Sequence, residues 1–91
     1  MLIISQDKKS VINFDKVTNT WVENEENEFN IYSDGELLGI YKTEDRAEKV
    51  LQEITIAYTN IELINTRQFQ LETIIYGRDL ARLICYEMPE R

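Results

Sequence analysis

The chain has no histidine, one cysteine and one proline among its 91 residues. Histidine is the usual general base near neutral pH and the commonest metal ligand, so its absence removes the ordinary activating partner of a serine or cysteine nucleophile. Cys85 can form no disulfide within the chain, and its apolar neighbours indicate a buried, inert thiol. We therefore predict no catalytic residues, no metal site and no cofactor, and we expect a protein that is not an enzyme.

Long hydrophobic runs are also missing. No apolar stretch approaches the roughly 20 residues that a membrane-spanning helix needs. The first residues lack the basic region, apolar run and small-residue cleavage site of a signal peptide. We expect a cytoplasmic protein with no membrane contact.

Positive charge is scarce, with 10 basic against 17 acidic residues and a net charge of −7. This balance disfavours direct binding to nucleic acid and suits a basic surface on another protein. The lysines all lie within residues 1–60, whereas residues 61–91 contain only arginines as cations. The guanidinium fork matches phosphate or carboxylate. One hypothesis is an anion pocket at a subunit junction, with the ligand-binding residues Arg67, Tyr76, Arg78 and Arg82; ordinary surface arginines are the alternative.

The apolar residues alternate with polar ones through the first 41 positions, which predicts strands. The Asp34-Gly35 pair is typical of a tight hairpin turn that needs positive φ angles. Gly39, inside the last of these strands, indicates a bulge or a close approach by a helix. The predicted strands cover residues 1–6, 11–14, 17–22, 29–33 and 37–41.

The period then changes to that of a helix. Thr43 is placed to cap it, and Glu44 and Asp45 follow where acids favour the positive end of the helix dipole. Apolar residues at steps of three and four form one stripe. This pattern predicts an amphipathic helix over about residues 44–59. The stripe consists of Ala47, Val50, Leu51, Ile54, Ala57, Tyr58 and Ile61.

Residues 60–80 are less specific. We favour a second helix that ends near Gly77, although residues 73–76 fit a strand equally well. Residues 81–88 indicate a closing strand that ends before Pro89. The predicted fold is a single α+β domain over residues 1–91, with an antiparallel sheet of about five strands that the closing strand rejoins. One helix cannot cover both faces of that sheet, so we expect a homo-oligomer.

Two groups of side chains admit more than one interpretation. The acidic run at residues 23–28 is favoured as a solvated hairpin tip, and a nucleic-acid mimic or a cation site is the alternative. Aromatic residues are numerous, and alternation places Tyr32 on the face opposite Phe29 and Ile31. An interface or core is favoured for these rings over a base-stacking platform for a nucleotide.

Three short motifs carry a resemblance to a known group of proteins. They are the opening Ile3-Ile-Ser-Gln-Asp7, the joint Tyr41-Lys-Thr-Glu-x-x-Ala47 and the ending Tyr86-Glu-Met-Pro-Glu90. Together they resemble small proteins carried by phages and mobile elements of Gram-positive bacteria, which end in F-x-F-P. This chain has Tyr86 and Met88 at the two phenylalanine positions.

The resemblance implies a context, by analogy. We expect a small non-enzymatic phage-type protein in the host cytoplasm. It would counter a host defence by sequestering a nucleotide second messenger or by blocking a basic host protein. A structural or regulatory phage accessory protein that acts only through protein contacts is the alternative. A small enzyme is the third hypothesis, which the missing histidine disfavours.

Overall fold

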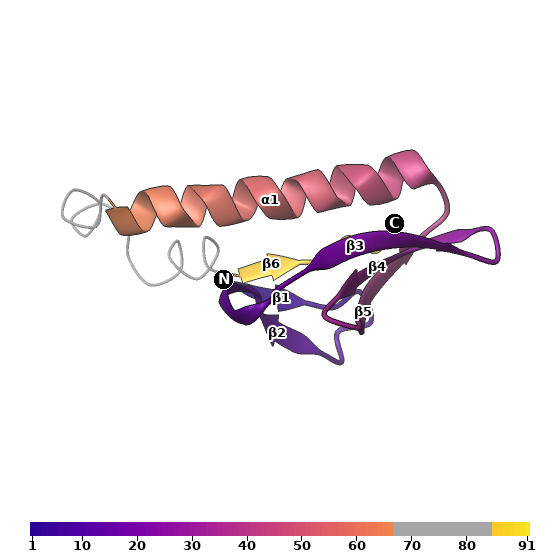
Figure 1. Cartoon of the computed structure of the whole chain (residues 1–91), viewed down its shortest axis with the longest axis horizontal. Coiled ribbons are helices and arrows are strands. Elements are labelled where there is room, and N and C mark those ends of the chain that lie inside the picture. Colours follow the sequence, from indigo (N-terminus) through magenta and orange to yellow (C-terminus); the bar gives the residue numbers. More distant parts are fainter. Residues whose placement is uncertain (67–84) are drawn as a thin grey trace.

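The computed structural model describes residues 1–66 and 85–91, with side chains for residues 1–60 and 85–91. These segments form an α+β fold with two three-stranded sheets and one long helix (Figure 1). In chain order the elements are β1 (Leu2–Ile4), β2 (Val11–Asn13), a 3-10 turn η1 (Phe14–Lys16), β3 (Thr20–Glu25), β4 (Glu28–Ser33), β5 (Glu36–Tyr41), α1 (Glu44–Thr66) and β6 (Cys85–Glu87).

The first sheet has the strand order β2-β1-β6. Ile3 of β1 lies opposite Ile12 in the antiparallel pair with β2 and opposite Tyr86 in the parallel pair with β6. The prediction of one antiparallel sheet of about five strands is therefore wrong. The turn η1 separates the two sheets: the Asn13 side chain accepts a hydrogen bond from the Asp15 amide, and the ladder of β2 ends there.

The second sheet has the order β3-β4-β5 and is antiparallel throughout. Asp34 and Gly35 have φ angles of 49° and 87°, which confirms the predicted tight turn. The other turn consists of Glu26 and Asn27, also at positive φ. The strand predicted at residues 17–22 lies three residues further on, so much of the acidic run belongs to strands rather than to a loop.

Gly39 lies beside a bulge, as predicted. Ile31 of β4 lies opposite Gly39, but its neighbour Tyr32 lies opposite Leu37, so Leu38 is the extra residue. A Cβ atom at Gly39 would be 3.0 Å from the Tyr41 ring and hydroxyl and 3.3 Å from the Met88 methyl group. The side chains that approach Gly39 therefore come from Tyr41 and Met88 and not from the helix.

Helix α1 begins as expected, because the Thr43 hydroxyl accepts a hydrogen bond from the Arg46 amide at 3.2 Å. Ala47, Val50 and Ile54 of the predicted stripe are at most 1% exposed and lie in the core. The helix is longer than predicted and continues to Thr66, along the second sheet and past η1 (Figure 1). The rest of the predicted second helix lies in residues 67–84, outside the described residues.

Candidate functional site

The four residues predicted to bind an anion, Arg67, Tyr76, Arg78 and Arg82, all lie outside the described residues. Their grouping stays a prediction. The described segments contain a different cationic site, where the start of α1, the end of β5 and the last residues of the chain meet.

Gln6 holds this junction together. Its backbone amide donates to the Leu38 carbonyl at 2.8 Å, and its side-chain oxygen accepts from the Ile40 amide at 2.9 Å. Its side-chain nitrogen lies within hydrogen-bond distance of the carbonyls of Ile40, Pro89 and Glu90, at 3.1, 3.2 and 2.9 Å. One side chain thus connects the first sheet, the second sheet and the C-terminal segment.

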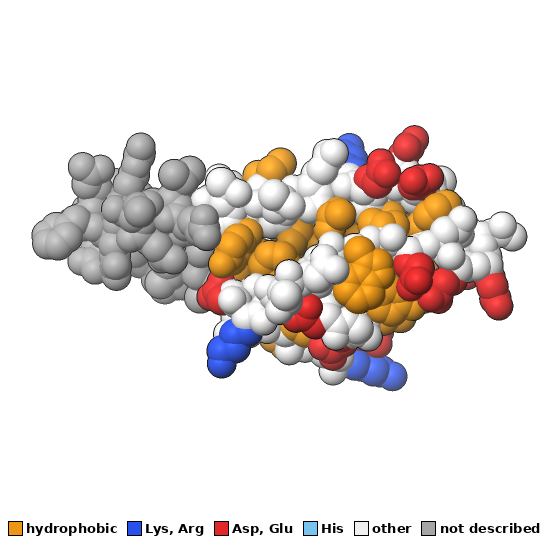
Figure 2. All heavy atoms as spheres, in the orientation of Figure 1, with side chains coloured by type: hydrophobic (Ala, Val, Ile, Leu, Met, Phe, Trp, Pro, Cys, Tyr) orange, Lys and Arg blue, Asp and Glu red, His pale blue; other side chains and the backbone are white. Residues whose placement is uncertain are grey.

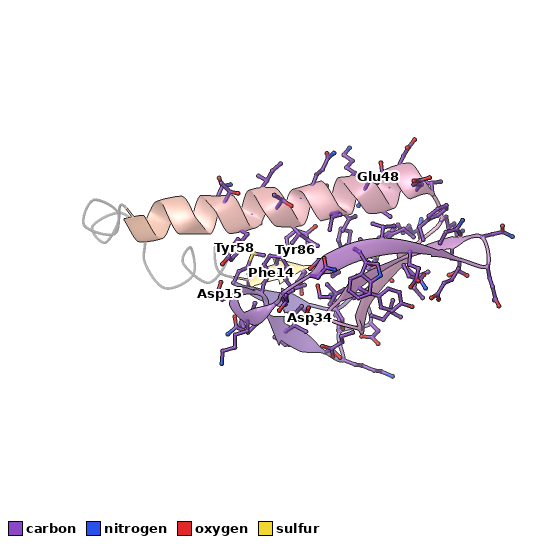
Figure 3. All side chains as sticks on the ribbon, viewed as in Figure 1. Phe14, Asp15, Asp34, Glu48, Tyr58 and Tyr86 are labelled. Carbon is purple, nitrogen blue, oxygen red and sulfur yellow. The ribbon has the colours of Figure 1, made fainter. Side chains whose placement is uncertain are left out.

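Two tyrosines fix the same junction from the other side. The Tyr41 hydroxyl donates to the Pro89 carbonyl at 2.8 Å, and the Tyr86 hydroxyl donates to the Glu53 carboxylate at 2.9 Å. Figure 3 shows Tyr86 lying beneath α1, on the same side as Tyr58. The segment after β6 is therefore held between α1 and the edge of β5.

Burial raises the pKa of Tyr41 to about 12. Burial also raises the pKa of Tyr86, and its hydrogen bond to the Glu53 carboxylate raises it further because the bond needs the neutral hydroxyl. Both hydroxyls therefore remain neutral donors at any physiological pH. Neither group is a base or nucleophile near pH 7, and both act as structural ties.

A pocket of about 640 Å³ opens at this junction, beside the first turn of α1. Its lining includes three cationic side chains, Lys42, Arg46 and Arg91, and one acid, Glu90. The remaining lining residues are Ile40, Tyr41 and Thr43. Three of the seven cations within the described residues thus line one pocket of a strongly acidic chain.

Arg46 is held in place at the pocket. Its Nε atom donates to the Arg91 carbonyl at 2.7 Å, its guanidinium lies 3.7 Å from the Glu53 carboxylate, and it lies 6.0 Å from the Tyr41 ring centroid. Lys42, by contrast, forms no ion pair with any of the described side chains, those of residues 1–60 and 85–91. One fixed and one free cation beside a helix N-terminus can bind an anion such as a phosphate group.

The predicted aromatic surface is only partly open. Trp21 and Tyr32 lie opposite each other on β3 and β4, and their rings stack with centroids 5.7 Å apart and planes at 24°. Phe29 instead packs against the core. Phe14 does so too, and its ring lies edge-to-face with the Tyr58 ring, with centroids 5.2 Å apart. One aromatic pair therefore remains on the face of the second sheet away from the helix.

No group of three or more histidine, cysteine or acidic side chains within the described segments could hold a metal ion. No helix in the same segments is long and apolar enough to cross a bilayer. Comparison with protein-family models, with curated proteins and with solved structures finds no match to this chain.

Sequence reasoning missed the junction pocket. Lys42 and Arg46 occur within an otherwise ordinary helix start, and Gln6 follows a short strand with no pattern of its own. The nearest signal was the group of three short motifs, because the opening, the joint and the ending all meet at this place in the structure.

Proposed function

We propose that this protein is a small binding protein that sequesters a phosphate-bearing small molecule of the nucleotide type and carries out no reaction on it. The observation that supports the proposal is the pocket at the start of α1, where Lys42, Arg46 and Arg91 converge in a chain of net charge −7. The resemblance to phage and mobile-element proteins adds the context: the ligand is a host defence signal, bound in the host cytoplasm by a homo-oligomer.

The size and chemistry of the pocket suit such a ligand. Small-molecule sites commonly enclose about 300–1,000 Å³, and this pocket falls within that range. The lining combines a tyrosine and an isoleucine with the cations, so an anionic group and an apolar or aromatic group can bind together. Glu90 offsets one of the three cations in the lining, and the Glu53 carboxylate, 3.7 Å from the Arg46 guanidinium, partly offsets another.

The pocket and the predicted arginine set can be tested together. Native mass spectrometry of the purified chain, with and without a panel of cyclic and ADP-ribose-type nucleotides, would show added mass per subunit and the number of subunits. Isothermal titration of any nucleotide that binds gives its Kd. We expect Lys42→Gln to weaken that Kd about tenfold, which corresponds to about 1.4 kcal/mol.

Lys49→Gln is the matched control, because Lys49 is an exposed helix cation that does not line the pocket. A second variant, Arg78→Gln, tests the predicted arginine set. If Lys49→Gln and Lys42→Gln weaken binding equally, the junction pocket is not the site. If no nucleotide in the panel changes the mass of the protein, the proposed function is wrong in its ligand class.

A second candidate function is the blocking of a basic host protein. It is favoured by the distribution of charge on the second sheet, which carries acids and no cations between Lys16 and Lys42. A phage accessory protein that acts only through protein contacts would use the same surface.

A further inference from the structure

The second sheet is acidic throughout. Residues 17–41 contain six acids and no lysine or arginine, and this range includes all of β3, β4 and β5. Figure 2 shows acidic side chains gathered at the end of the molecule that holds the β3–β4 turn and the start of α1, next to a hydrophobic patch. Negative charge and apolar area are therefore adjacent at this end of the molecule.

The face of this sheet away from the helix carries a specific arrangement. Trp21 and Tyr32 stack on each other, and Leu37, opposite Tyr32 in the register, is 40% exposed. Because side chains alternate along a strand, Glu23 and Glu25 share this face with Trp21. The stacked rings are thus followed along β3 by two carboxylates.

Glu25 is fixed in this arrangement. Its carboxylate accepts hydrogen bonds from the Tyr32 hydroxyl at 3.2 Å and from the Asn30 side-chain nitrogen at 2.9 Å. Two donors hold this carboxylate in one position before any ligand arrives. Binding a cation there therefore costs little free energy for ordering the carboxylate.

Asn30 provides a second, independent indication of a ligand. The residue is only 6% exposed, and its side-chain oxygen is buried with no hydrogen-bond partner among the described residues. Leaving such an oxygen unpaired destabilises the folded protein, because the oxygen has lost its bonds to water and gained none in return. Asn30 lines a hollow of about 460 Å³ together with Glu25, Glu26 and Glu28. Three carboxylates thus line the hollow, beside a buried amide oxygen that has no partner among the described residues.

We propose that this face binds an arginine side chain on a basic segment of a partner protein. A guanidinium has five N–H donors in one plane, so it can pair with the Glu25 carboxylate and the Asn30 oxygen while its flat surface lies against the Trp21–Tyr32 stack. A lysine ammonium is a compact point charge and cannot make both kinds of contact. The Asn30 amide has to turn as the guanidinium enters, because its oxygen is closed to solvent in the free protein. The turn breaks the bond from the Asn30 side-chain nitrogen to Glu25, and a guanidinium N–H takes its place on that carboxylate.

This proposal rests on the second candidate function, a basic protein partner, and it is independent of the phosphate-binding pocket, whose charge has the opposite sign. The protein can bind arginine on this face even if it binds no nucleotide, and it can bind a nucleotide in the pocket even if it binds no arginine. The two sites are distinguished by their variants, because Lys42 takes no part in the arginine site and Glu25 takes no part in the pocket.

The chain provides its own probe for the test. Trp21 is the only tryptophan, so intrinsic fluorescence reports directly on this face. We would titrate the full chain with hexa-arginine and with hexa-lysine at equal ionic strength. The expected result is that hexa-arginine changes the Trp21 emission and binds at least about fivefold more tightly than hexa-lysine. Equal affinity of the two peptides would overturn the proposal, since it would indicate only attraction between net charges.

Two variants locate the site. Glu25→Gln removes the carboxylate that the guanidinium pairs with, and we expect it to weaken hexa-arginine binding about tenfold. Glu87→Gln is the control, because it removes one charge from an exposed residue of the first sheet. Equal weakening by the two variants would refute the site.

Side-chain amide resonances give a readout that needs no variant. Hexa-arginine should shift the Asn30 NH₂ signals in a ¹⁵N correlation spectrum more than those of the exposed Asn24. An Asn30 signal that stays unchanged at saturation would show that the buried oxygen is not the acceptor, and the proposal would fail.

Discussion

Replacement of Gln6 tests whether one side chain holds the two sheets and the C-terminal segment together. The side-chain amide has two hydrogens to share among three carbonyls and one oxygen that accepts from the Ile40 amide, so about three hydrogen bonds exist at a time. A net contribution of about 0.5–1.5 kcal/mol for each, reduced by partial access of water, predicts a loss of about 2 kcal/mol for Gln6→Ala.

Gln6→Glu separates hydrogen bonding from size. At pH 7 the new carboxylate has no hydrogen to donate and faces the carbonyl oxygens of Ile40, Pro89 and Glu90. We expect a loss of about 3 kcal/mol, larger than for alanine, because charge repulsion adds to the missing bonds. Urea unfolding followed by circular dichroism gives the free energy of unfolding for each variant.

The pH dependence gives the sharper test. The carbonyls favour the protonated acid, so the folded-state pKa of the introduced carboxyl group rises above its unfolded value of about 4.3. The introduced carboxyl group is then least destabilising below that unfolded pKa. The loss in free energy of unfolding grows as pH rises through the folded pKa. At about pH 4 the difference between the glutamate and alanine variants should shrink or reverse, because a protonated carboxyl can donate again.

Comparison of the variants with wild type at each pH removes the effects of all other titrating groups. A difference between Gln6→Glu and Gln6→Ala that is constant from about pH 4 to about pH 7 would refute the assigned hydrogen bonds. Unfolding of Gln6→Glu at the wild-type urea midpoint at neutral pH would refute the structural role of the residue.

The remaining predictions concern the packing around the same junction. Gly39→Ala should lower the free energy of unfolding by about 2 kcal/mol, because the added methyl group meets Tyr41 and Met88. Gly35→Ala should lower it by about 1 kcal/mol, because the new methyl group meets no atom but the residue has a φ of 87°. Equal free energies of unfolding for Gly39→Ala and wild type would contradict the packing around Gly39. Tyr86→Phe should lose about 1 kcal/mol with its bond to Glu53. The pKa of Tyr86 is raised in the folded protein, so above about pH 10 its hydroxyl ionises first in the unfolded chain. The stability of the wild type should therefore fall with rising pH there, and that of Tyr86→Phe should fall less steeply. Parallel pH profiles would show that Tyr86 is not buried as described.

Features that depend on neighbouring residues in the chain were predictable. The Asp34-Gly35 turn, the Thr43 cap and the bulge near Gly39 each follow from the conformational preferences of two or three adjacent residues. The buried stripe of α1 was predictable for the same reason, since a helix places residues three and four apart on one face.

The arrangement of the strands was not predictable in this way. Alternation shows that a segment is a strand, but it does not identify the partner strand. The parallel pair of β1 and β6 joins residues more than 80 positions apart, and nothing in either three-residue strand specifies it. The split into two sheets depends on the short turn η1, whose Asn13 cap looks like any polar residue between strands.

The predicted anion site stays a prediction, and the junction pocket was not predicted. Arginine content led to Arg67, Arg78 and Arg82, which lie outside the described residues. The cations that do converge are Lys42 and Arg46, and they do so because a helix start and the C-terminal segment meet at Gln6. Net charge indicates which ligands a chain favours, but only tertiary contacts decide which charges lie together.

The three motifs of the resemblance acquire a common physical explanation from this junction. The opening supplies Gln6, the joint supplies Tyr41 and the helix cap, and the ending supplies Pro89, whose carbonyl lies within hydrogen-bond distance of both side chains. The ending also supplies Met88, which lies beside Gly39. Each motif can therefore be accounted for by folding alone, so sharing them implies a shared fold before it implies a shared ligand. A specific function therefore depends on side chains that the junction does not require. Within the described part of this chain, two examples are Lys42, which has no ion-pair partner there, and the acidic side chains of the second sheet, which has no cations.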